Sequence, residues 1–278
     1  MSSPSGVTQR QPALEHPSLR DEAVTLAREA IYRFLGLTLR GPHEPIWSDG
    51  VRMADPRLLL QAALVAAEEQ PEAVAAELAE GLQAAARALR ERPKESLQAE
   101  YDRLFGLVLP KDCPPCETEY IRAADVFQRA QVMADVAGFY RAFGLKPART
   151  APERPDHVSL MCEFMATVLM KQRIAVADGR EEQELLCVEA AGKFFAEHLS
   201  WWVPAFAHAL STKAKGGFFD AVAKALATWI AVERDRYGLA NGAGEEVRPE
   251  LIEPPEEAGG CLECPLLRRS EPPQHQGA

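Results

Sequence analysis

The sequence predicts an all-α fold, a single compact multi-helix domain with flexible N- and C-terminal tails. The composition is rich in Ala, Leu and Glu, and only five Tyr occur among 278 residues. Runs of β-branched residues are few, and no stretch alternates apolar and polar residues as a half-buried strand would. Because 47% of the residues are hydrophobic, a chain of this length can bury a substantial core. We therefore expect about nine or ten helices.

Proline and glycine divide the N-terminal part of the chain into successive helices. Proline lacks a backbone N–H and fits the first turn of a helix, so Pro56, Pro71 and Pro93 each indicate a helix start. A capping-box pattern over 18–21 begins the first helix, and Gly41 ends it. The expected helices span residues 19–39, 55–69, 71–90 and 93–105.

The C-terminal part predicts a second group of helices, over 124–143, 156–176, 181–199, 201–210 and 218–237. The first of these has the spacing of a strongly amphipathic helix, with Val126 and Phe127 on its apolar side. We expect a flexible tail over 1–17, one helical domain over 18–238, and a flexible tail over 239–278 that contains a Cys-x-x-Cys island.

The charge of the chain restricts its partners. A formal net charge of −10 and a sequence pI near 5.2 argue against nucleic acid or an anionic membrane surface as the main partner. A basic or apolar peptide suits it better. Residues 1–17 have no signal-peptide core, and no run reaches ~18 uninterrupted apolar residues. We expect a cytoplasmic protein without stable membrane insertion, whose six Cys are thiols or metal ligands.

Two Cys-x-x-Cys pairs are candidate metal ligands: Cys113 with Cys116, and Cys261 with Cys264. Four thiolates can hold zinc or a [2Fe–2S] cluster. Against a shared site, the pairs are far apart in the sequence, and neither is followed by the Gly that commonly completes a zinc knuckle. The alternative is that they are unrelated surface thiols. Zinc or iron measured in protein purified without chelator would decide between the two. The other two cysteines, Cys162 and Cys187, occupy apolar helix positions and are expected in the core.

No catalytic constellation stands out. The sequence has no Gly-rich phosphate loop, His-Glu-x-x-His pair, Gly-x-Ser-x-Gly elbow or dinucleotide fingerprint. A hydrolase using His157 with a carboxylate ranks low because no nucleophile or oxyanion arrangement accompanies it. We predict that the protein is not an enzyme.

The stretch 153–157 ends a Pro-rich loop and opens an apolar segment. Pro155 fits a first helical turn, and Asp156 can cap the free N–H groups there. His157 is less easily explained, because the helix dipole disfavours a protonated His at that end. It is either a partly buried, hydrogen-bonded core residue or part of a binding site.

Three segments in this order resemble the TorD/DmsD/NarJ family of chaperones for molybdenum oxidoreductases. Residues 100–105, Glu-Tyr-Asp-Arg-Leu-Phe, are similar to the family's Glu-Tyr-x-x-Leu-Phe helix end. Residues 114–120, Pro-Pro-Cys-Glu-Thr-Glu-Tyr, resemble its Pro-Pro-Tyr-Glu-Ser-x-Tyr loop. Residues 153–157 and 163–165 resemble its Pro-Asp-His and Glu-Phe-Met signature. The general pattern covers about 19–237.

The resemblance implies an all-helical chaperone that needs no cofactor. Such proteins bind the N-terminal signal peptide, often twin-arginine, and the body of a molybdopterin-containing catalytic subunit, and hold it back from export until the cofactor is inserted. We expect His157 to face the groove that binds the peptide. The residues that the resemblance assigns to this binding site or its surroundings are Asp156, His157, Glu153, Tyr101, Glu117 and Tyr120.

The sequence departs from the family pattern at Cys116, where Tyr is usual, and in having Cys113 and the pair in the C-terminal tail. These departures leave a second hypothesis, a metal- or redox-responsive regulatory protein that uses the two Cys-x-x-Cys pairs with zinc or an iron–sulfur cluster. Replacing Cys113 and Cys261 by Ser would separate the two, because a chaperone should keep its peptide binding and lose no metal.

Overall fold

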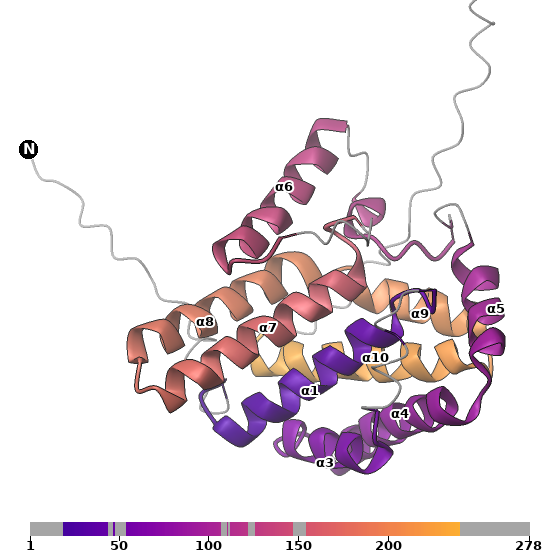
Figure 1. Ribbon diagram of the computed structural model, residues 1–278, viewed down its shortest axis with the longest axis horizontal. Helices are drawn as coiled ribbons and strands as arrows, with labels where there is room; N and C mark the ends of the chain where they lie inside the picture. Colours follow the sequence, from indigo (N-terminus) through magenta and orange to yellow (C-terminus); the bar gives the residue numbers. More distant parts are fainter. Residues whose placement is uncertain are drawn as a thin grey trace, which may run out of the picture.

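The computed structural model describes residues 19–43, 47, 54–106, 110, 112–121, 126–146 and 154–239. These residues form nine α-helices, one 3₁₀ turn and one π turn, and their only β feature is an isolated bridge (Figure 1). The prediction of an all-helical fold is confirmed. The elements are α1 (Glu22–Thr38), α3 (Pro56–Ala66), α4 (Glu72–Glu91), α5 (Lys94–Phe105), η3 (Glu117–Tyr120), α6 (Val126–Ala142), α7 (Val158–Ala177), α8 (Glu181–Phe194), η4 (Phe195–Leu199), α9 (Val203–Ala214) and α10 (Phe218–Arg236).

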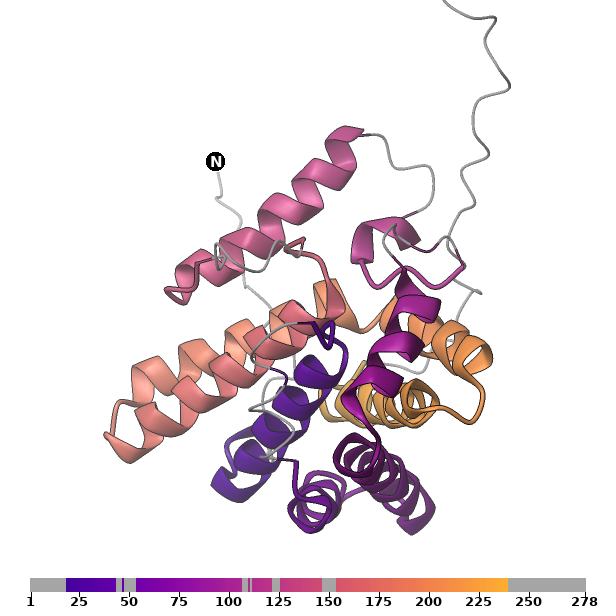
Figure 2. The same cartoon turned by 45° about the vertical axis from the view of Figure 1, so that its right-hand side comes forward.

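The body of the fold is a bundle in which α10 packs on α4 and α9, α1 packs on α3 and α7, and α7 packs on α8. In both views α6 lies at the edge of this bundle and projects away from it (Figures 1 and 2). Large side chains from most of these helices are fully buried, among them Tyr32, Phe164, Phe206 and Trp229. None of the described helices is both long and apolar enough to cross a lipid bilayer.

Local capping explains where several helices begin. Asp21 accepts a hydrogen bond from the amide of Val24 and caps α1, and Asp55 accepts one from Arg57 and caps α3. The sequence pattern had placed the first cap one turn earlier. A side-chain oxygen at the cap satisfies an N–H that has no partner within the helix, which favours these start points.

The predicted helix over 181–199 is α-helical only to Phe194, because its last turn, η4, is a π turn over Phe195–Leu199. A π turn contains one residue more than an α turn, and it changes the direction in which the following side chains point. This turn carries Glu197 and His198 at the end of α8 that lies beside α6.

A buried polar network ties the first helix to the last. The guanidinium of Arg28 on α1 makes two hydrogen bonds, of 2.8 and 2.9 Å, to the carboxylate of Glu233 on α10. The hydroxyl of Tyr32 donates to the same carboxylate at 3.0 Å, and Arg28 also donates to Tyr237. Arg28 and Glu233 are almost completely buried, so each of these charges depends on the other.

The apolar face expected along α6 is only partly buried. Phe139 and Tyr140 near its C-terminal end pack against Phe164 of α7. At the other end, Val126 and Phe127 are 80% and 84% exposed. These two residues of the expected apolar side are therefore not covered by the rest of the described protein. The first turns of α6 lie beyond the edge of the bundle (Figure 2).

Candidate functional site

The second and third segments of the family resemblance meet in space. An antiparallel bridge joins Cys116 to His157, and the amide of Glu117 donates to the carbonyl of Asp156 at 3.0 Å. The loop over 112–121 is thereby fixed to the chain that leads into α7. We call this contact the loop junction, formed by residues 114–120 and 154–157.

Asp156 is the centre of the loop junction. Its carboxylate is fully buried and accepts hydrogen bonds from the amide of Thr118 at 3.1 Å and from the hydroxyl of Thr118 at 2.8 Å. Arg154 adds an ion pair at 2.8 Å. The prediction that Asp156 caps α7 is wrong, since its side chain binds the first turn of η3, and this bond fixes a segment distant in sequence.

His157 is the N-cap of α7. Its Nδ1 accepts a hydrogen bond from the amide of Ser159 at 3.2 Å and lies 2.7 Å from the Ser159 hydroxyl. The side chain is only 4% exposed, so it does not lie on an open surface of this structure, and its role in peptide binding stays a prediction. Burial lowers the pKa of His157, and the charges of Arg40 and Arg154 act in the same direction. The charge of Asp156 opposes them, and together these effects give a pKa of about 4. At neutral pH His157 is a neutral structural group.

Glu117 links the loop junction to the end of α8. Its carboxylate is 2% exposed, lies 3.1 and 3.2 Å from Nδ1 of His198, and accepts a hydrogen bond from the indole of Trp201 at 3.3 Å. Burial raises the pKa of Glu117, although the hydrogen bonds from both partners oppose this. Burial lowers the pKa of His198. The hydrogen bond and charge of Glu117 and the charges of Asp135 and Glu197 outweigh this effect, so the pKa is raised.

The sequence reasoning missed His198. The sequence signal next to it is the pair Trp201 and Trp202. Neighbouring residues on a helix point about 100° apart, so the pair predicts one ring in the core and one at a groove or rim. This is confirmed, because Trp202 is fully buried and Trp201 is partly exposed.

The rim of the loop junction carries an ion-pair chain that reaches α6. Arg154 pairs with Glu119 at 2.8 Å, and the other oxygen of Glu119 pairs with Arg129 of α6 at 3.0 Å. The hydroxyl of Tyr140, also on α6, donates to the carbonyl of Pro155 at 2.8 Å. These contacts join the loop junction to α6.

The two tyrosines assigned by the resemblance lie in different surroundings. Tyr120 is buried in the loop junction, where its hydroxyl donates to the carbonyl of Pro114 at 3.0 Å and its ring packs on Trp202. Tyr101 packs in a separate aromatic cluster with Phe105 and Phe219. The structure thus gathers Glu117, Tyr120, Asp156 and His157 at one place and Tyr101 at another, while Glu153 lies outside the described residues.

Cys113 and Cys116 are each 1% exposed, so the alternative that they are surface thiols is wrong. Burial raises the pKa of Cys113 to about 12, against the opposing charge of Lys213, which disfavours the thiolate that a metal would need. Cys261 and Cys264 lie outside the described residues, so the four-cysteine site stays a prediction. Cys162 and Cys187 are buried core residues, as expected.

Comparison with known proteins decides the family. The family model "Nitrate reductase delta subunit" matches residues 68–208, which is half of the chain and contains the whole loop junction, α6, α7 and η4. The chain belongs to this family. The resemblance to the TorD/DmsD/NarJ chaperones is thereby confirmed.

Two curated relatives agree with this assignment. A selenate reductase assembly chaperone protein of Thauera selenatis is 28% identical over 110 residues, which are 40% of this chain and 55% of the relative. A chlorate reductase assembly chaperone protein of Ideonella dechloratans is 30% identical over 78 residues, 28% of this chain and 39% of the relative. The chain thus matches about half or less of their length. Both names describe assembly chaperones rather than catalysts, in agreement with the prediction of a protein that is not an enzyme.

Proposed function

We propose that this protein is a cytoplasmic chaperone for the catalytic subunit of a molybdopterin-containing reductase. It binds the N-terminal signal peptide and the body of that subunit, assists cofactor insertion and delays export until insertion is complete. The observation that carries the proposal is the match of residues 68–208 to a family whose relatives named above assemble reductases.

An exposed apolar surface at the start of α6 supports this proposal. Val126 and Phe127 are the most exposed large apolar side chains of the described residues, and they are the first two residues of α6. A signal peptide has arginines followed by an apolar segment. The net charge of −10 attracts the arginines over a distance, which speeds encounter, and burial of the apolar segment against Val126 and Phe127 slows dissociation.

In this proposal the buried residues act by positioning. Asp156 and His157 are too deeply buried to touch a peptide without rearrangement, but they hold the loop junction, and the junction holds α6 through Arg154, Glu119 and Arg129. Glu117 and Tyr120 contribute to the same junction. Changing any of them is expected to alter peptide binding through the position of α6.

The test is binding of a synthetic signal peptide to the full chain, measured by calorimetry, together with co-purification from a host that makes molybdenum reductases. We expect one peptide per chain, weaker binding when the two arginines are replaced by glutamines, and a molybdoenzyme catalytic subunit in the co-purified material. Recovery of no such subunit, with reductase activity intact after deletion of the gene, would rule the proposal out.

A further inference from the structure

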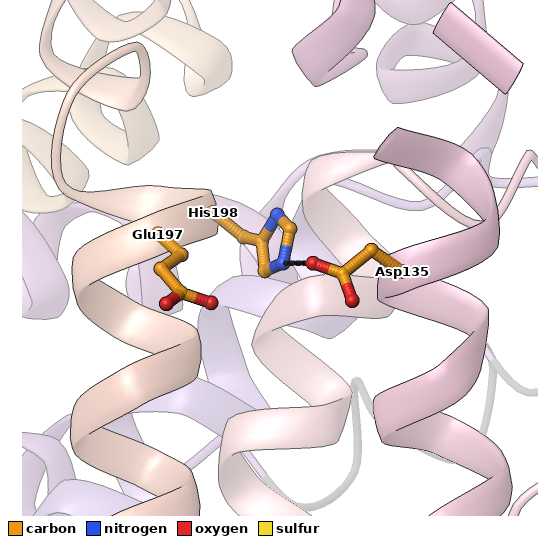
Figure 3. Close-up of side chains that lie close together, drawn as sticks. All are labelled: Asp135, Glu197 and His198. Atoms are coloured by element: carbon orange, nitrogen blue, oxygen red, sulfur yellow. Dashed lines mark ion pairs between the residues drawn. The ribbon is translucent and has the colours of Figure 1, made fainter. Parts of the chain in front are cut away.

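Three side chains that can ligate a metal converge where α6 meets the end of α8. They are Asp135 of α6 and the neighbours Glu197 and His198 of η4, as Figure 3 shows. One potential ligand atom from each lies within 4.8 Å of the others. The two carboxylates are exposed and His198 is buried.

The imidazole of His198 is the second observation that points to a ligand. The residue is 4% exposed, and Nε2 is buried without a hydrogen-bond partner among the described residues. Asp135 Oδ2 lies 3.3 Å from Nε2, but without the geometry of a hydrogen bond. A buried imidazole nitrogen without a hydrogen bond lowers the free energy of unfolding, unless another group, such as a metal ion, binds its lone pair.

The other nitrogen of His198 is held as it is in known metal sites. Nδ1 lies 3.1 Å from Glu117, whose carboxylate also accepts from the indole of Trp201. A carboxylate bound at one imidazole nitrogen places the proton there and leaves the lone pair of the other nitrogen free for a metal. In this tautomer the lone pair is on Nε2, the nitrogen that lies 3.3 Å from Asp135 Oδ2.

We propose that His198 Nε2, Asp135 and Glu197 bind a divalent transition-metal ion of the zinc type, with Glu117 as the carboxylate that orients His198. Two ligand atoms of a tetrahedral zinc with bonds of about 2.0–2.1 Å lie roughly 3.3 Å apart. The Nε2–Oδ2 separation is 3.3 Å. Glu197 is exposed, so a change of rotamer can bring its oxygen closer.

The ligand types favour zinc over magnesium and calcium. An imidazole nitrogen with two carboxylates suits zinc and its neighbours in the first transition row, whereas magnesium and calcium prefer shells made of oxygen. Three protein ligands leave a fourth position for water or for a group of a partner. The ion ties α6 to η4, in addition to the Arg129–Glu119 ion pair and the bond from Tyr140 to Pro155.

The test uses the full chain with Cys261 and Cys264 replaced by Ser, so that the tail thiols cannot compete for zinc. After removal of metal with a chelator, Zn²⁺ is titrated by calorimetry, and hydrogen exchange of α6 is measured with and without it. We expect one equivalent of Zn²⁺, slower exchange in α6, and no thiolate absorption when Co²⁺ replaces Zn²⁺.

Asp135→Asn and Glu197→Gln each remove one exposed ligand, so neither should unfold the protein without metal, although Asp135→Asn also removes the contact with His198 and can lower the melting temperature slightly. Each is expected to weaken Zn²⁺ binding tenfold or more and to abolish the slowing in α6. Glu189→Gln and Asp178→Asn, exposed carboxylates outside the cluster, are the matched controls and should bind as the reference does. No bound Zn²⁺, equal affinity in Asp135→Asn, or Co²⁺ absorption from thiolate would each overturn the proposal. None of these results depends on binding of the signal peptide.

Discussion

Asp156 binds Thr118 twice, through the main-chain amide at 3.1 Å and through the hydroxyl at 2.8 Å. Thirty-eight residues separate the two in sequence. A single buried carboxylate thus joins two segments of the family signature. Through this bond Asp156, which precedes the N-cap of α7, holds the loop over 112–121 in place before α6.

Replacing Asp156 by Ala should destabilise the protein by about 1–3 kcal/mol. The change leaves the buried amide and hydroxyl of Thr118 without their acceptor, while Arg154, which is one-third exposed, keeps its ion pair with Glu119. Thr118→Val removes only the hydroxyl and should cost about 1 kcal/mol. Urea unfolding of the two variants and of the double variant measures both losses. Strictly additive losses would contradict the direct contact, since residues in contact should show a coupling energy of about 0.5–3 kcal/mol.

His157 should make the protein less stable in mild acid. Its folded pKa is about 4, below the value of 6.5 for the free group. Between these values the unfolded chain binds a proton that the folded chain does not, so stability falls as pH falls from 6.5 towards 4. A shift of this size corresponds to about 3 kcal/mol over the whole window.

The measurement is the free energy of unfolding as a function of pH for the wild type and for His157→Asn. Asn is a good N-cap and does not titrate, so the variant should keep α7 and lose this part of the slope. Because the other titrating groups are the same in both proteins, only the difference between the two curves is assigned to His157. Curves that run parallel from pH 6.5 to 4 would show that His157 is not a buried neutral group.

The positions of the helices followed from local chemistry, and therefore could be predicted. Pro56, Pro71 and Pro93 fall at or next to helix starts, because a residue without N–H costs nothing in a first turn. The π turn η4 could not be predicted. A π turn contains one residue more than an α turn, and over only five residues this does not change the spacing of apolar positions enough to distinguish it from an α-helix.

The loop junction was predicted only in part. The order of the motifs predicted that Glu117, Asp156 and His157 lie together. The prediction that Asp156 caps α7 took into account only residues near it in sequence. In the structure the amide of Thr118 binds the same carboxylate. His198 was missed because its partner Glu117 is 81 residues away. No periodicity within one helix carries information about such a pair.

The ion pair between Arg28 and Glu233 should be essential to stability. Both groups are nearly inaccessible to solvent, so Glu233→Ala leaves a buried guanidinium without its counter-charge and should cost about 3–5 kcal/mol. Joint replacement of the pair by Met and Leu should recover only part of this loss, because it removes the charge of Arg28 but leaves buried Arg236, which pairs with the same carboxylate at 3.2 Å. Thermal unfolding measured by circular dichroism tests both statements, with the exposed Glu182→Gln as control. A double variant no more stable than Glu233→Ala would contradict the assignment.

Phe127 should affect client binding without affecting the fold. The ring is 84% exposed, so Phe127→Ser removes little buried surface and should change the free energy of unfolding by less than about 0.5 kcal/mol. If the apolar part of the signal peptide covers this ring, the same change should weaken peptide binding about tenfold or more, which is roughly 1.4 kcal/mol.

Leu58→Ser is the matched control, since Leu58 is 62% exposed on α3, on the side of the bundle opposite α6 (Figure 1). Calorimetry with one peptide and all three proteins should separate them. Equal weakening by both variants would mean that the loss comes from surface apolarity in general, and unchanged binding by Phe127→Ser would move the peptide site away from the start of α6.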